Sequence, residues 1–133
     1  MKTRFLTALI SALLISYPAM AGQINTVRVT VTPNADGSGS AGGTLSAARN
    51  SLNRVEFIGC GFRMYNNATG GITRWGFCQA TNSAGVNGFC MIENNDLLNA
   101  ISGISDYSYV DFNWNAAGTC TRIAFSSQSF YLP

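Results

Sequence analysis

Alternation between apolar and polar side chains is the strongest pattern in this sequence. Along residues 24–32, INTVRVTVT, three valines alternate with polar side chains. The pattern returns in residues 107–114, YSYVDFNW, and a turn at residues 115–118 leads into residues 119–126, TCTRIAFS. Side chains two positions apart share one face of a strand, so each segment predicts a strand with one face on a core.

The middle of the chain predicts a meander of three strands, at residues 53–65, 72–81 and 89–93, joined by polar, glycine-containing turns. Residues 53–65 carry large apolar side chains on both faces, which predicts a central strand covered on both sides. The glycine-rich residues 33–44 predict a flexible linker or hairpin loop. A first strand tethered in this way is free to pair within its own domain or with a neighbour.

Residues 94–105 predict a short helix, centred on residues 95–104. Asn94 or Asn95 is suited to cap it, and Asp96 favours its first turn. An apolar stripe follows at helical spacing, formed by Leu97, Leu98, Ile101 and Ile104. Residues 45–52 fit a short strand or one helical turn, and the apolar tail at 127–133 is expected to pack or to pair as a last strand. We therefore predict an all-β fold, a small antiparallel β-sandwich or meander barrel with one short helix.

The first 21 residues have the pattern of a secretory signal peptide. Lys2 and Arg4 precede an apolar run at residues 6–15, and Ala19-Met20-Ala21 is a small-x-small cleavage signal. The run is shorter than the roughly 20 residues that span a bilayer. Cleavage after Ala21 leaves 133 − 21 = 112 residues, which is one domain by length, at 22–133. We expect a secreted or periplasmic protein.

Four cysteines in an exported chain of this length predict two disulfides. Zinc is the competing use, but the gaps of 17, 11 and 29 residues contain no close cysteine pair, and histidine is missing. Simple hairpins centred on Thr69 and Ala84 place the first three cysteines in one row across the sheet. Two pairings remain open: Cys60–Cys78 with Cys90–Cys120, which we favour slightly, or Cys78–Cys90 with Cys60–Cys120.

Charge excludes several classes of partner. After cleavage the chain keeps six arginines and six acidic residues, so its net charge is 6 − 6 = 0. Nucleic-acid binding requires a basic footprint, and binding to an anionic membrane surface requires a polybasic patch. We therefore expect that the protein does not bind nucleic acid and that the mature chain does not insert into a membrane. A neutral surface does tolerate self-association, because no net repulsion opposes it.

Composition also argues against catalysis. Without histidine, the chain has no Ser-His-Asp or Cys-His arrangement, and disulfide formation leaves no free thiol. A carboxylate pair for glycoside hydrolysis needs two acids that face each other, and no spacing indicates such a pair. Asp111 lies inside an aromatic strand and is expected to face solvent while Val110, Phe112 and Trp114 point inward. We therefore expect a protein that is not an enzyme and that needs no cofactor or metal.

Aromatic residues beside polar ones suggest a binding platform. Saccharides present apolar ring faces and hydrogen-bonding groups, and aromatic rings next to polar side chains suit both. The candidate residues are Arg74, Trp75, Tyr109, Asp111 and Trp114. The alternative is that both tryptophans fill the core.

Three functions remain open at this point. The first is an exported binding protein for a glycan or another cell-envelope component. The second is a structural subunit of a pilus-like surface assembly, built by β-strand addition through the first strand. The third is a secreted inhibitor or toxin that presents the loop at residues 82–88.

Overall fold

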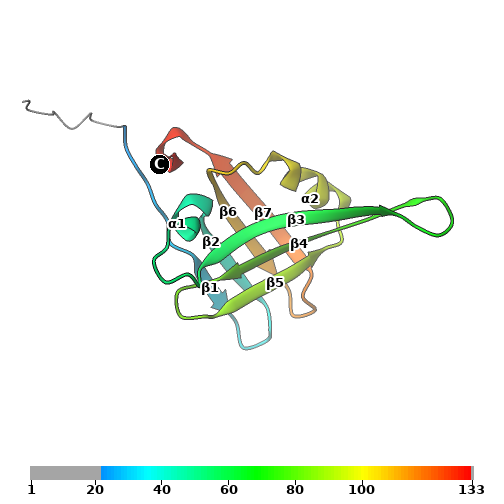
Figure 1. The fold of residues 1–133 in the computed structure, drawn as a ribbon. Coiled ribbons are helices and arrows are strands. Elements are labelled where there is room, and N and C mark those ends of the chain that lie inside the picture. Colours follow the sequence, from blue (N-terminus) through cyan, green and yellow to red (C-terminus); the bar gives the residue numbers. More distant parts are fainter. Residues whose placement is uncertain (1–21, 133) are drawn as a thin grey trace, which may run out of the picture.

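Strands dominate the structure, a computed structural model that describes residues 22–132. A four-stranded antiparallel sheet has the order β1-β2-β6-β7, and a three-stranded antiparallel sheet has the order β3-β4-β5 (Figure 1). The strands are β1 (Thr30–Pro33), β2 (Gly39–Thr44), β3 (Phe57–Asn66), β4 (Ile72–Thr81), β5 (Asn87–Ile92), β6 (Ser108–Trp114) and β7 (Cys120–Ser127).

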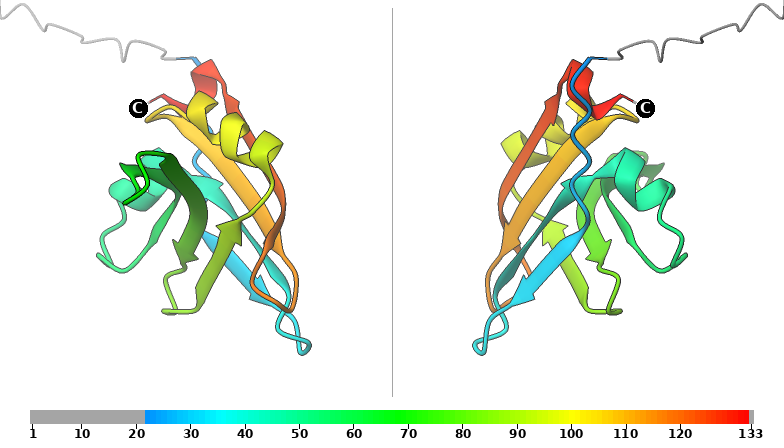
Figure 2. Two further views of the ribbon diagram at one scale, coloured as in Figure 1. Left: turned by 90° about the vertical axis from the view of Figure 1, so that its right-hand side faces the viewer. Right: turned by 90° about the vertical axis from the view of Figure 1, so that its left-hand side faces the viewer.

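The two sheets form two layers around one core, as Figure 2 shows from the sides. Fully buried Val110 and Phe112 on β6 face the layer that carries Cys78 and Ala80 on β4. Neither sheet closes on itself. The predicted all-β sandwich is therefore confirmed, and the alternative of a meander barrel is wrong.

The predicted helix is confirmed in a shorter form. Helix α2 (Asn95–Ala100) continues into a 3-10 turn, η1 (Ile101–Gly103). The Asn94 side chain accepts hydrogen bonds from the backbone N–H groups of Asp96 and Leu97, which caps the helix. The ambiguous residues 45–52 contain one helical segment, α1 (Leu45–Arg49).

The first strand is shorter than predicted and is held within its own domain. Only Thr30–Pro33 form β1, but the alternation persists upstream, because Val29 and Val31 are both buried. Thr44 donates its backbone N–H to the carbonyl of Val27 at 2.9 Å. The backbone N–H of Asn25 bonds to the carbonyl of Phe130 at 2.7 Å. The expected loose tether is therefore wrong.

Half of the predicted glycine-rich loop is a strand. Residues Gly39–Thr44 form β2 between β1 and β6, and only the short stretch before them is a turn. Glycine is required here for close packing: a Cβ on Gly39 would lie 2.4 Å from the Trp114 indole and 2.7 Å from the Thr32 carbonyl oxygen. The glycines of this segment, which are typical of a flexible loop, here allow a large aromatic ring to pack closely against the backbone of a strand.

The meander is confirmed in order, but β3 is an edge strand and not a central, covered one. It forms an unbroken ladder of ten residue pairs with β4, and its other edge has no strand beside it. The β3–β4 hairpin extends well beyond the rest of the molecule (Figure 1). The tail packs as predicted, in a 3-10 turn, η2 (Ser129–Tyr131), and not as a strand.

Both disulfides match the favoured pairing. Cys60 pairs with Cys78 across β3 and β4, and Cys78 also stands opposite Cys90, so the predicted row of three cysteines is confirmed. Cys90 bonds to Cys120 on β7 and links the two sheets covalently.

The disulfides bear on the predicted export. Disulfides are typical of oxidising compartments, which is compatible with an exported protein. Within residues 22–132, no helix is both long enough and apolar enough to cross a membrane. The predicted signal peptide, at residues 1–21, lies outside the described residues and stays a prediction.

Candidate binding surface

The cysteine row fixes which side chains face inward on the three-stranded sheet. Cys78 and Cys90 are fully buried, and side chains two positions away along each strand share their face. The neighbouring Gly76, Ala80 and Ile92 are buried on that inner face as well. Side chains at the intervening positions therefore project from the outer face.

That outer face carries a connected group of aromatic rings. Trp75 and Phe77 lie on β4 with their ring centroids 5.6 Å apart. Phe77 stacks on Phe89 of β5 at 6.3 Å, with 21° between the ring planes. The guanidinium carbon of Arg63, on β3, lies 5.4 Å from the centre of the Phe77 ring. We call these four residues the aromatic face.

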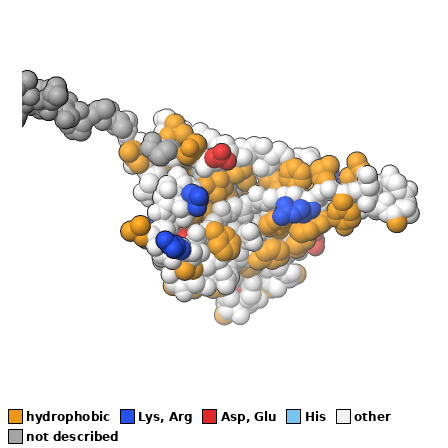
Figure 3. Space-filling view, viewed as in Figure 1, with side chains coloured by type: hydrophobic (Ala, Val, Ile, Leu, Met, Phe, Trp, Pro, Cys, Tyr) orange, Lys and Arg blue, Asp and Glu red, His pale blue; other side chains and the backbone are white. Residues whose placement is uncertain are grey.

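Two exposed aromatic residues of β3, Phe57 and Tyr65, extend this outer surface. Phe89 is 51% exposed, whereas Trp75 and Phe77 are half-buried by their neighbours. Figure 3 shows hydrophobic side chains gathered over the β3–β4 hairpin, with a basic group among them. Exposed apolar groupings of this kind mark interaction sites more often than chance placement does.

Glycine keeps the aromatic face open on the β3 side. Gly59 and Gly61 place no side chain beside the rings, and a Cβ on Gly61 would lie 3.4 Å from the Phe77 ring. Polar groups lie at its margin, where exposed Gln79 stands opposite Phe89 in the β4–β5 ladder. The result is a shallow aromatic strip with hydrogen-bonding side chains around it.

The structure does not gather the five predicted binding residues into one place. Trp75 is on the aromatic face. Arg74 points from the opposite face of β4 and donates hydrogen bonds to Asn95, at 3.0 Å, and Asn99, at 3.4 Å, on α2. This arginine secures the helix to the sheet.

The other three candidates belong to β6 in the other sheet. Tyr109 and Asp111 project from its outer face, where Asp111 forms an ion pair with Arg122. Asp111 therefore faces outward between buried Val110 and Phe112, as predicted.

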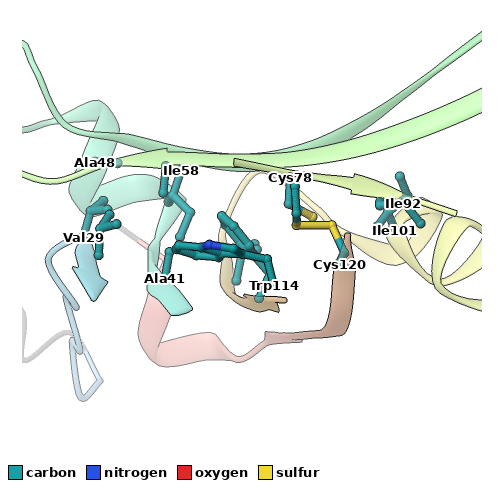
Figure 4. Packing of buried hydrophobic residues seen from close by; sticks show 14 of the residues in the cluster. Val29, Ala41, Ala48, Ile58, Cys78, Ile92, Ile101, Trp114 and Cys120 are labelled. Carbon is teal, nitrogen blue, oxygen red and sulfur yellow. A yellow bond between two sulfur atoms is a disulfide. The ribbon is translucent and has the colours of Figure 1, made fainter. Parts of the chain in front are cut away.

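Trp114 lies in the core between the sheets, 7% exposed (Figure 4). Its indole N–H donates to the carbonyl of Gly37 at 3.0 Å, which satisfies the one polar atom of the ring. A buried ring offers no surface to a ligand, so the alternative of a core residue describes Trp114.

Sequence reasoning missed Arg63, Phe77 and Phe89, although a usable signal was present. The cysteine row divides each strand of the meander into an inner and an outer set. With the cysteines placed inward, Trp75, Phe77 and Phe89 fall on the outer face together. The predicted register therefore contained the aromatic face.

A second group of polar residues, around Glu56, is structural. The Glu56 side chain is 2% exposed, accepts a hydrogen bond from Asn53 Nδ2 at 2.7 Å, and lies 3.9 Å from the Arg28 guanidinium. Ser51 and Asn53 hold the pKa of this carboxyl below its ordinary value, and the charge of Arg28 acts in the same direction. These contacts join the segment before β1 to the loop before β3.

Searches against models of protein families, curated protein sequences and solved structures found no similar protein.

Proposed function

We propose that this is an exported, non-enzymatic binding protein that uses its aromatic face to hold a glycan chain of the cell envelope. One observation carries the proposal: Trp75, Phe77 and Phe89 form a connected aromatic strip on an outer sheet face, beside Arg63. Phe89 of this strip is 51% exposed, and the exposed side chains of Phe57 and Tyr65 on β3 continue the same outer surface.

The chemistry of the strip suits a sugar polymer. Pyranose rings present flat C–H faces that pack on aromatic rings, and their hydroxyl groups need donors and acceptors at the margin. Arg63 and Gln79 supply those groups. The strip runs across strands of a sheet and is shallow, so it suits an extended chain better than a small molecule that needs enclosure.

Two features support binding without catalysis. The chain contains no histidine, and Cys60, Cys78, Cys90 and Cys120 are all in disulfides. The side chains of the aromatic face include no carboxylate, which glycoside hydrolysis normally uses in pairs.

The experiment is a retention assay on insoluble cellulose, chitin and peptidoglycan. We expect the mature protein to be retained on one of them, and Trp75→Ala and Phe89→Ala each to weaken retention about tenfold or more, because central aromatic contacts contribute more than about 1.4 kcal/mol.

Tyr107→Ala is the matched control, because Tyr107 is an exposed aromatic residue, 41% accessible, outside the three-stranded sheet. Its retention should equal that of the unaltered protein. Equal losses in all three variants, or no retention on any of the matrices, would contradict the proposal.

A further inference from the structure

Helix α1 lies beside the start of β3, where Leu45 approaches Gly59, but in residues 22–132 no strand pairs with the open edge of β3. Exposed edges normally carry charges, proline, bulges or a covering segment, because an open edge pairs readily with another strand. The remaining edges have such features. β1 has four residues and ends at Pro33, and β7 carries Arg122 beside a break in its register with β6. The turn before β7 covers part of the β5 edge, where the backbone N–H of Met91 donates to the carbonyl of Gly118 at 2.9 Å.

By contrast, β3 is ten residues long, contains no proline, and pairs with β4 without a break in register. Its single charge is Arg63, which lies over the Phe77 ring on the outer face and also reaches the edge, where it donates to the carbonyl oxygen of Phe62. Five of the twelve large hydrophobic side chains that are exposed belong to the β3–β4 hairpin, namely Phe57, Phe62, Met64, Tyr65 and Ile72. This concentration is what an uncovered interface requires.

The backbone groups at this edge can be assigned. Antiparallel pairs alternate between those that exchange hydrogen bonds and closer pairs that do not. Asn67 donates its N–H to the Gly71 carbonyl at 2.8 Å where the hairpin turns, and the Cα atoms of Cys60 and Cys78 are only 4.0 Å apart. Odd-numbered residues of β3 therefore bond to β4, and even-numbered ones point their N–H and C=O groups to the open edge.

A side-chain contact agrees with this assignment. Arg63 Nη1 donates to the carbonyl oxygen of Phe62 at 3.3 Å, so this oxygen is directed away from β4. The backbone N–H and C=O groups of Cys60, Phe62 and Met64 form the outward row that another strand would bond, and a paired strand would share or replace the bond of Arg63 to the Phe62 carbonyl.

We propose that a second copy of this chain occupies the edge, with the two β3 strands antiparallel about a two-fold axis. The mature chain has no net charge to oppose this contact. In every register except the one centred on Arg63, that arginine faces an uncharged residue of β3 in the second copy. The hairpin extends beyond the rest of the molecule (Figure 1), so the bodies of two copies paired in this way would lie toward opposite ends of the paired strands.

The dimer would have a continuous six-stranded sheet with two aromatic faces on one surface. A glycan chain would then contact both copies, and two linked sites bind a polymer more tightly than one site does. This consequence depends on the proposed function, but the pairing itself does not.

The test is the mass of the mature protein in solution, measured by light scattering during size-exclusion chromatography at about 100 µM, where a dissociation constant of ~10 µM leaves mostly dimer. We expect twice the mass of the mature chain. Phe62→Pro should give a monomer, because proline removes an outward N–H without removing a bond to β4. Phe62→Ala removes the same ring but keeps the N–H, and should retain dimer.

A second readout uses amide hydrogen exchange. On dilution to a monomer, the amides of Cys60, Phe62 and Met64 should exchange faster by tenfold or more, while those of Gly61 and Arg63 should not change. If Phe62→Pro fails to fold, Met64→Lys takes its place, because a lysine on the edge opposes pairing without altering the ladder.

A monomer at about 100 µM, a larger open series of masses, or a dimer that survives both edge variants would overturn the proposal. Loss of glycan retention in Trp75→Ala with an unchanged dimer would separate the two proposals. A dimer that no matrix retains would also separate them, because this result supports the pairing of β3 strands but not glycan binding.

Discussion

The outer faces of the two sheets arise from the same alternating pattern, but their side chains differ in how many partners they find within the chain. On the four-stranded sheet, Tyr109 lies across Gly42, where a Cβ would be 2.7 Å from its hydroxyl oxygen, and it stacks on Tyr131 at 6.1 Å. Burial raises the pKa of the Tyr109 phenol, and Asp111 pairs with Arg122. The side chains of this face find their partners within the chain.

On the three-stranded sheet, the aromatic rings contact mainly one another and Arg63. The C-terminal turn η2 places Tyr131 against Tyr109 of the first sheet, whereas Phe89 on the three-stranded sheet is 51% exposed. The comparison shows that alternation identifies an outer face but does not tell whether the chain covers it. Coverage separates a structural face from one available to a ligand.

The largest expected effect contrasts the two tryptophans. Trp114→Ala should lower the free energy of unfolding by about 3–5 kcal/mol, because it leaves a cavity between the sheets. Trp75→Ala should lower the free energy of unfolding by no more than about 1 kcal/mol, because the Trp75 ring is half-exposed and is not part of the core between the sheets. Urea denaturation of both variants measures the difference, and similar losses would refute the contrast between the faces.

A second contrast concerns glycines on the two sheets. Gly39→Ala would place a methyl group 2.4 Å from the buried Trp114 ring and 2.7 Å from a backbone oxygen, so we expect a loss of about 1–3 kcal/mol. Gly61→Ala meets only the accessible Phe77 ring at 3.4 Å and should change stability by less than about 1 kcal/mol. Melting temperatures of the two variants would rank them, and the reverse order would be inconsistent with this packing.

The smallest expected effect is at the junction between the sheets and depends on pH. The pKa of Glu56 is lowered by folding, so its stabilising contribution is complete above the pKa of the unfolded chain and is lost as pH falls through the folded pKa. Arg28 is the charged group that faces it.

Glu56→Gln should be less stable than the unaltered protein at pH 7, and the gap should narrow toward pH 3. Urea denaturation at both pH values measures this gap. A constant gap would mean that the carboxylate charge contributes nothing. Asn53→Ala serves as the matched variant, because it removes the amide that bonds to Glu56 and leaves the carboxylate.

Much of the fold can be predicted from local sequence patterns, namely the spacing of the cysteines and the alternation of apolar and polar residues. The equal spacing of Cys60 and Cys78 about Thr69, and of Cys78 and Cys90 about Ala84, predicted the register of β3, β4 and β5. Alternation placed Val110 and Phe112 inward and Asp111 outward. These features are local, since a short hairpin determines which residues stand opposite each other.

The predictions that failed concern contacts between segments that are far apart in the sequence. The glycines of β2 resemble a loop because the reason for them, the Trp114 ring, is 75 positions away from Gly39. Alternation does not determine strand order, so the sequence predicts a central strand at residues 53–65, whereas β3 is an edge strand. The five candidate binding residues do not lie together in the structure, because β4 and β6 belong to different sheets.

The most direct measurement of the central claim follows the indole N–H signals of the two tryptophans by NMR. A soluble oligosaccharide from whichever matrix retains the protein would be titrated into it. The account predicts that the Trp75 signal shifts progressively with ligand while the Trp114 signal stays fixed, because one ring is on the aromatic face and the other is buried. Saturable binding that leaves the Trp75 signal unmoved would contradict it.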